Sequence, residues 1–331
     1  MKQILDQFFK LTENKTSFKK EFIAGFTTFI TMAYIIFVNP QIMAQSGMDQ
    51  GAIFVGTCVA ASVACIFMGL YANWPIGLAP GMGLNAFFTY TVVGEMGYSW
   101  ETALGAVFLA GILFFIISVT NLRRWMIDSI PMNLRVAIGS GVGLFIGFIG
   151  LKSGGIIISN DVTYLSLGDF SKYQTILAAL GFLIISVLAV RKINGAIIIG
   201  VLIVTLISLL IGLVEYNGLL AYPPNIYPTF MKLDILGALD VAMISVIMSF
   251  LFVNLFDTTG TLLGVATRAN LIDDNGNAKN LNKALAVDSS SSIFGTFFGC
   301  SPVTSYIESS AGVESGGKQV WFPWLLDYFL Y

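Results

Sequence analysis

Charge and histidine are what this sequence has least of. Only 11% of its 331 residues are charged, less than half of the about 25% typical of soluble domains. The chain contains no histidine, which excludes imidazole metal ligands and imidazole proton relays. Any proton chemistry must therefore use carboxylates. With 17 basic against 19 acidic residues, a basic face for nucleic acid is also excluded.

Cysteine is scarce as well. Cys58, Cys65 and Cys300 form no CxxC pair and have no zinc-type spacing. The sequence shows neither a nucleophile–base pair nor a metal-ligand cluster, so we expect no enzymatic activity, no metal and no cofactor. The first 20 residues are polar and contain five lysines, unlike a signal peptide. We expect residues 1–20 to be a cytoplasmic segment.

Apolar residues, in contrast, make up 56% of the chain, and the mean hydropathy is +0.81. A soluble protein of this length could not bury so much apolar surface. Long apolar runs predict membrane-spanning helices. Eight regular spans are predicted at 21–40, 51–72, 101–121, 132–151, 174–190, 194–214, 238–266 and 284–299. Two further apolar stretches, 73–94 and 300–318, are interrupted by glycine and proline.

The distribution of lysine and arginine tests this count of ten spans. If the N-terminus is cytoplasmic and the spans alternate, 14 basic residues fall inside and 3 outside. Cytoplasmic loops carry such an excess. We therefore expect a multi-pass protein of the cell membrane with its N-terminus in the cytoplasm.

The order of the spans indicates an inverted repeat. With seven spans in the first repeat, the eighth enters from the opposite side. The tripeptide Phe37–Asn39 of the first span recurs as Phe252–Asn254 in the eighth, and both interrupted spans are third in their repeats. Paired interrupted spans indicate a transporter binding site. The prediction is an all-α seven-plus-seven inverted-repeat transporter fold with an incomplete second repeat.

Each interrupted span predicts a short extended strand followed by a half-helix. In the first, Pro75, Pro80 and three glycines at 77, 81 and 83 exclude an ordinary helix, and the half-helix is predicted to begin near Leu84 or Asn85. A re-entrant turn or close helix packing is the alternative. In the second, Glu308 lies in the first turns of the half-helix, where the helix dipole favours an anion.

The eighth span carries another acid, Asp257. On a helix, Asn254, Asp257 and Thr261 fall on one face. An interhelical hydrogen bond is the alternative explanation, particularly for Asn254. Asp288 is a weaker candidate, expected to lie in a closely packed helix. Four glycines of the fifth span are expected to let helices pack closely: Gly139, Gly141, Gly143 and Gly147.

Asp257, Glu308 and Asn85 are thus expected to converge on one site at membrane depth. Carboxyl and amide groups both donate and accept hydrogen bonds when the acid is protonated. This set suits a neutral, planar solute with several hydrogen-bonding groups. A protonatable acid also couples solute binding to a proton gradient by linkage.

At these residues the chain resembles the nucleobase–cation symporters, in the azaguanine-type branch of adenine/guanine/hypoxanthine permeases. The matching stretches are Gly25–Tyr34, Val38–Pro40, Ala79–Ala86, Phe256–Thr261, Ser301–Thr304 and Ile307–Ser309. The resemblance implies proton-coupled uptake of purine nucleobases. It implies that purine is bound by Asn85, Asp257, Glu308, Gly83 and Thr258, with Asp257 and Glu308 coupling the proton.

The resemblance also implies the domains. Spans 1–4 (21–121) and 8–10 (237–318) would form a core domain, and spans 5–7 (122–236) a gate domain. The partners expected are a purine substrate and the lipid bilayer but no nucleic acid, with a homodimer as one candidate assembly.

The last residues depart from the family pattern. Residues 319–331 differ from the Thr-Gly-Leu continuation expected after Lys318. Synonymous codons for Gln319 to Phe329, read one base out of frame, can encode Thr-Gly-Leu-Val-Ser-Leu-Val-Thr-Gly-Leu-Phe. The hypothesis is a one-base frameshift, testable by resequencing the gene. A chain without spans 11–14 is expected to be an inactive truncation.

Two other functions compete with a purine permease. One is an anion transporter or channel of the same inverted-repeat fold, which we would expect to carry serine or a basic residue in place of Glu308. The other is a non-functional membrane fragment. The sequence does not indicate which purine is preferred.

Overall fold

The computed structural model describes residues 16–120, 132–214, 218, 222–272 and 278–317. Residues 1–15 of the predicted cytoplasmic segment and the predicted aberrant tail at 319–331 lie outside these ranges. Contacts divide the chain into two units. Unit 1 combines residues 1–138 with 223–331, and unit 2 is residues 139–222. These units are defined by contacts alone, and the division into a core domain and a gate domain stays a prediction.

Unit 1 begins with the regular spans of the first half of the chain. Helices α4 and α6 start at polar caps, which satisfy amides at the helix ends: Asp49 accepts a hydrogen bond from the Ala52 amide at 2.7 Å, and Ser99 accepts one from the Thr102 amide at 3.2 Å. The helices are α2 (Phe18–Met32), α3 (Ile35–Ala44), α4 (Gln50–Phe67), the π-helix η1 (Met68–Ala72) and α6 (Trp100–Val119).

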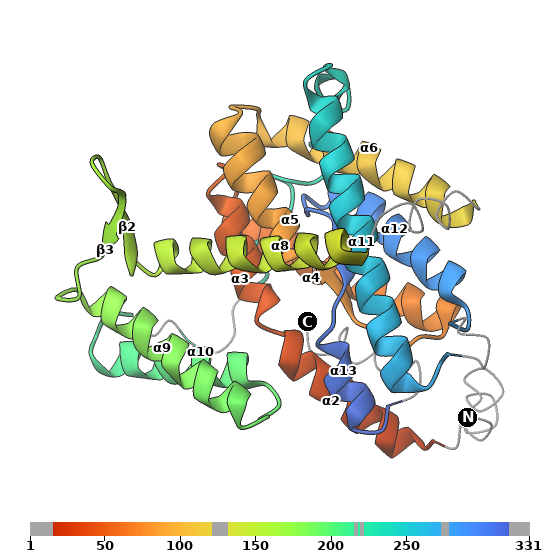
Figure 1. The fold of residues 1–331 in the computed structure, drawn as a ribbon, viewed down its shortest axis with the longest axis horizontal. Helices are drawn as coiled ribbons and strands as arrows, with labels where there is room; N and C mark the ends of the chain where they lie inside the picture. The colour runs from red at the N-terminus through yellow and green to blue at the C-terminus, as the bar shows by residue number, and fades with distance from the viewer. Residues whose placement is uncertain (1–15, 121–131, 215–217, 219–221, 273–277, 318–331) are drawn as a thin grey trace. The chain divides into compact units, whose positions relative to one another are not determined.

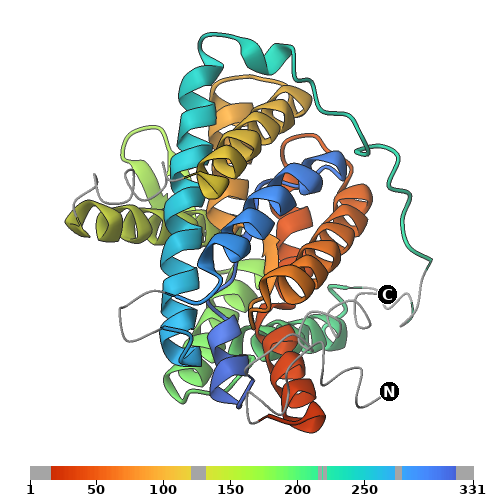
Figure 2. The same cartoon turned by 90° about the vertical axis from the view of Figure 1, so that its right-hand side faces the viewer.

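The second half of unit 1 packs against the first. It contains the short 3₁₀ helix η3 (Gly237–Leu239), the long helix α11 (Met243–Ala269) and α12 (Leu281–Phe297). Helix α12 packs against both α6 and α4, and α6 crosses α11 and contacts it (Figure 2). Fully buried Trp74, Phe88, Phe114 and Phe250 are among the largest side chains of this core.

Both interrupted spans adopt the predicted strand and half-helix. The first contains β1 (Leu78–Pro80), α5 (Met82–Ala86) and the π-helix η2 (Phe87–Glu95), and the second contains β4 (Val303–Ser305) and α13 (Ser309–Glu314). Helix α5 begins two residues before the predicted Leu84, because the extended Gly81 already acts as its N-cap. The expectation of two interrupted spans is confirmed.

The next three spans lie in unit 2, except that residues 132–138 at the start of the first of them belong to unit 1. They are α8 (Met132–Ser153), α9 (Tyr173–Val190) and α10 (Ala196–Leu210), with a hairpin of β2 (Ile157–Asn160) and β3 (Tyr164–Leu167) between α8 and α9. Figure 1 shows the hairpin after the end of α8, and α9 lying beside α10.

Three of the four glycines singled out in α8 have no close neighbour among the described residues. A Cβ added to Gly141, Gly143 or Gly147 would meet no atom of the described residues within 4 Å. Gly143 and Gly147 instead line a cavity of about 750 Å³ between α8, α9 and α10. The predicted packing of Gly139, Gly141, Gly143 and Gly147 against other helices stays a prediction.

Five helical segments in the described residues are long and apolar enough to cross a membrane: Lys19–Ala44, Gln50–Ala72, Trp100–Val119, Tyr173–Val190 and Met243–Ala269. They coincide with five of the ten predicted spans. Shorter apolar helices at Gly143–Ser153 and Ala196–Leu210 fall in two more. The chain is a multi-pass membrane protein.

Candidate functional site

The candidate site is built where the two interrupted spans cross. Strands β1 and β4 pair antiparallel, with Ala79 opposite Thr304 at the centre. All six residues of the two strands are buried. Backbone groups at membrane depth need partners inside the protein, and here each non-helical strand supplies partners for the other.

Further bonds extend this crossing beyond the strands. The Gly81 amide donates to the Pro302 carbonyl at 2.9 Å, and the Tyr306 amide donates to Gly77 at 3.0 Å. The Tyr306 hydroxyl donates to the Pro80 carbonyl at 2.5 Å. A Cβ at position 81 would lie 2.7 Å from Cγ2 of Thr304, so only glycine permits this approach.

Asp257 lies on α11 next to the crossing. Its side chain is exposed in unit 1, while its neighbour Thr258 is buried. The Thr304 hydroxyl of β4 approaches an Asp257 carboxylate oxygen at 3.5 Å, which is a weak hydrogen bond at best. Asp257 therefore has most of its hydrogen-bonding capacity available to a ligand.

Glu308 stands at the N-cap of α13. It is half-buried, and its carboxylate accepts a hydrogen bond of 2.8 Å from the hydroxyl of Tyr34. Tyr34 lies at the break between α2 and α3 and is 4% exposed. Asp257 and Glu308 are near enough for their charges to interact. The structure thus brings together the two acids singled out from the sequence.

Neither acid has a cation beside it in the part of the chain that the structure describes. Among the described residues, Asp257 and Glu308 make no ion pair, and the Arg268–Glu314 pair at 3.0 Å involves exposed side chains. Two carboxylates at membrane depth without a cation are costly when both are ionised. Binding one proton would relieve both the desolvation and the mutual repulsion.

Thr258 lies in a buried polar cluster behind Asp257. Its hydroxyl lies 2.9 Å from a carboxylate oxygen of Asp288 and 3.0 Å from the Thr304 hydroxyl. Ser305 donates to the other Asp288 oxygen at 2.7 Å. Asp288, expected only to pack in a helix, is fully buried and joins α11, α12 and β4. The sequence feature that could have indicated this role is the carboxylate itself, directly before the four serines at 289–292.

Asn85 is placed differently from the two acids. It is fully buried; its side-chain NH₂ donates to the Asn39 side chain, and its carbonyl accepts from the Ser301 hydroxyl. Its contacts are therefore made within the protein. Gly83, on the same half-helix, is half-exposed. The predicted common face of α11 is divided, because Asn254 is buried against Ser292 while Asp257 is exposed.

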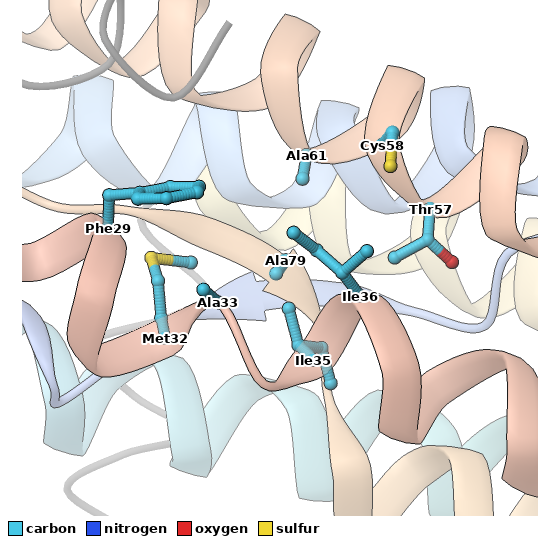
Figure 3. Close-up of a pocket in the computed structure, with 9 residues that line it drawn as sticks. All are labelled: Phe29, Met32, Ala33, Ile35, Ile36, Thr57, Cys58, Ala61 and Ala79. Atoms are coloured by element: carbon cyan, nitrogen blue, oxygen red, sulfur yellow. The ribbon is translucent and has the colours of Figure 1, made fainter. Parts of the chain in front are cut away.

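A small apolar cavity lies beside the crossing. It is about 10 Å³ in volume, with space for one water molecule at most. Figure 3 shows its lining: Phe29, Met32, Ala33, Ile35 and Ile36 from α2 and α3 with their connection, Thr57, Cys58 and Ala61 from α4, and Ala79 from β1. It is too small and too apolar to be a purine site.

Known proteins resemble this chain over most of its length. A family described as "Permease family" (Xan_ur_permease) matches residues 19–321. Adenine permease AdeP of Escherichia coli is 47% identical over 95% of this chain and 71% of its own length. Guanine/hypoxanthine permease PbuG of Bacillus subtilis is 41% identical over 94% of this chain and 73% of its own length.

A solved structure has the same fold at much lower identity. The transmembrane domain of the cyanobacterial bicarbonate transporter BicA superposes with a TM-score of 0.64. The match covers 94% of this chain and 81% of that domain at 13% identity. It shows the inverted-repeat transporter fold and, at this identity, nothing about the substrate.

Proposed function

The chain belongs to this permease family, and from that premise we propose that it is a purine nucleobase permease working by proton symport and alternating access. Relatives at 41–47% identity are named for adenine and for guanine/hypoxanthine. The observation that carries the proposal is the pair of acids, Asp257 and Glu308, beside the crossing of two interrupted spans. We propose that the chain catalyses no chemical change and needs no cofactor other than the transported proton.

The two acids would share the work of binding purine and proton. The exposed Asp257 carboxylate offers acceptors for the N–H groups of a purine ring. Glu308 retains one carboxylate oxygen beyond the one that Tyr34 occupies. When one acid is protonated, the pair presents an O–H donor together with acceptors, the mixture that purine edges require. Purine binding and protonation then favour each other by linkage.

The remaining predicted residues would act around this pair. Gly83 leaves room for the ligand on the exposed side of α5. Thr258 would position Asp257 through its hydrogen bonds with Thr304 and Asp288. Asn85 would hold the crossing together through its bonds with Asn39 and Ser301, and its predicted contact with purine would require its amide to leave these partners.

We propose that the protein lies in the cell membrane with its N-terminus in the cytoplasm. The 14 to 3 division of basic residues supports this orientation. Assembly as a homodimer stays a proposal.

The test is binding and uptake of radiolabelled adenine, guanine and hypoxanthine. The purified chain in lipid nanodiscs should bind at least one of these purines, and both Asp257→Ala and Glu308→Gln should weaken binding at least about tenfold. Glu314→Gln is the matched control, since Glu314 is an acid of α13 with a side chain 64% exposed. Its affinity should stay within about twofold of the wild type.

Uptake by cells without their own purine permeases then tests transport. Purine-dependent proton entry is expected, and its absence despite uptake would remove the symport. Wild-type binding by both acid variants would remove the site assignment. Binding of sulfate or bicarbonate in place of purine would favour the anion transporter.

A further inference from the structure

The repeated tripeptide marks the same contact in both repeats. Asn39 in α3 and Asn254 in α11 end the two Phe-Val-Asn sequences, and they are 0% and 3% exposed. Asn39 donates its side-chain N–H to the hydroxyl of Thr57 in α4 at 2.6 Å. Asn254 donates to the hydroxyl of Ser292 in α12 at 3.1 Å. Each asparagine thus joins the first span of its repeat to the second.

Both contacts continue to the interrupted span of the same repeat. In the first repeat, the Asn39 carbonyl accepts a hydrogen bond from the side chain of Asn85 in α5. In the second, the Ser292 hydroxyl donates to the backbone carbonyl of Val303 in β4 at 2.6 Å. We call these two sets of contacts the asparagine braces: Asn39–Thr57–Asn85 and Asn254–Ser292–Val303.

The braces are also connected to each other. Ser301, which precedes β4, donates its hydroxyl to the Asn85 carbonyl. Asn85 is therefore held by Asn39 from its own repeat and by Ser301 from the other. Ser301 and Thr57 are both fully buried, so water does not compete for these bonds.

The crossing needs such support because its strands are short. Strands β1 and β4 have three residues each. Pro80 of β1, which lies opposite Val303 of β4, has no amide hydrogen to donate, so the ladder between the strands has few hydrogen bonds. A buried amide without a partner is costly, which favours one arrangement of a fully bonded network. The braces can therefore fix the position of each strand relative to its own helices.

We propose that Asn39 and Asn254 are matched positioning residues, one in each repeat, which set the positions of β1 and β4. Asp257 lies three residues after Asn254 on α11, and Glu308 lies three residues after β4. The braces therefore also set how the two acids face each other. Insofar as these acids bind purine, which rests on the proposed function, loss of either brace weakens purine binding.

Hydrogen exchange tests the positioning without any ligand. Thr57→Val and Ser292→Ala remove one hydroxyl from each brace and preserve the volume more nearly than changes of the asparagines would. We expect the amides of 78–86 and 301–306 to exchange about tenfold faster in both variants, because Ser301 and Asn85 connect the repeats.

Two further variants serve as controls. Thr57→Ser keeps the hydroxyl and should restore wild-type exchange. Ser62→Ala removes a hydroxyl of α4 that is also buried but has no hydrogen-bond partner among the described residues, and it should change nothing at the crossing. Unchanged exchange at the crossing in Thr57→Val and Ser292→Ala, or faster exchange only in the repeat that carries the change, would overturn the proposal.

Purine affinity supplies the second measurement. At a temperature well below unfolding, Thr57→Val and Ser292→Ala should bind purine about tenfold more weakly, and Thr57→Ser and Ser62→Ala should bind as the wild type does. Faster exchange with unchanged affinity would overturn the positioning of the acids. If the wild type binds no purine, the proposed function fails, and hydrogen exchange still decides whether the braces hold the strands.

Discussion

Asp257 and Glu308 share a charge but not an environment. Asp257 is exposed with one weak contact from Thr304, whereas Glu308 is half-buried and held by Tyr34. A carboxylate held by a hydroxyl has a fixed orientation, so Glu308 is the more preorganised of the two. Asp257 is the more adaptable one.

The Tyr34 hydroxyl can be removed without changing the shape of the side chain. Tyr34→Phe should weaken purine binding by several-fold, up to about tenfold, because Glu308 then lacks the donor that orients it. Equilibrium binding of radiolabelled purine measures the effect. Tyr98→Phe is the control, since the Tyr98 hydroxyl donates to Asp240 at 3.3 Å, away from the crossing. An equal loss in both variants would contradict a specific role of Tyr34.

Gly81 tests the close approach of the strands. Gly81→Ala would bring a Cβ to 2.7 Å from Thr304, and we expect a loss of about 1–3 kcal/mol in stability from overpacking. Thermal unfolding in detergent measures it. In Gly260→Ala the added Cβ meets no described atom within 4 Å, so stability should not fall. If Gly81→Ala melts at the wild-type temperature, β1 and β4 can move apart to accommodate the added Cβ without loss of stability, which would contradict this expectation.

At the scale of the elements, Asp288 connects three of them. Its carboxylate lies within hydrogen-bonding distance of the hydroxyls of Thr258 in α11 and Ser305 in β4, while the residue itself belongs to α12. Asp288→Ala leaves both hydroxyls without this acceptor and should destabilise the protein by about 1–3 kcal/mol per lost partner. Asp288→Asn, which keeps an acceptor, should cost less.

The control for Asp288 is an acid of unit 2. Asp161, in the turn between β2 and β3, is exposed, and Asp161→Asn should leave the unfolding temperature within about 1 °C of the wild type. If Asp288→Ala has the same unfolding temperature as the Asp161→Asn control, the polar cluster behind Asp257 does not stabilise the fold.

Local sequence patterns predicted the elements well where local chemistry determines them. Proline and glycine at 75–83 removed helix as an option, and the interruption followed. The pairing of β1 with β4 could not be predicted, because no local pattern relates segments more than 220 residues apart in the chain. The partners of Asn85 could not be predicted for the same reason, because Asn39 and Ser301 come from distant segments. Its contact with purine stays a prediction.

At the scale of the whole molecule, the orientation in the membrane is open to a direct test. The three native cysteines are buried and should not react with a membrane-impermeant maleimide in intact cells. With the N-terminus in the cytoplasm, Asp161→Cys should be labelled from outside and Arg191→Cys only after permeabilisation, since both positions are exposed. The reverse pattern would invert the proposed orientation.

The composition and the order of spans were enough to predict a membrane-embedded inverted repeat, because both are properties of the whole sequence. Which residue faces a ligand and which faces a neighbour depends on helix rotation. At 100° per residue, Asn254 and Asp257 are only about 60° apart around α11, yet the first is buried and the second is exposed. The packing of α11 against α12 decides which of them is turned inward.

The antiparallel pairing of β1 with β4 has a consequence for biosynthesis. The Tyr306 hydroxyl and the Pro80 carbonyl that it bonds are 226 residues apart. At about 5–20 residues per second, a ribosome needs roughly 11–45 s to make that interval. Throughout this time β1 has left the ribosome without its partner strand, and its backbone must be sheltered by the insertion machinery or stay outside the bilayer. The candidate site can thus be assembled only after β4 has been synthesised.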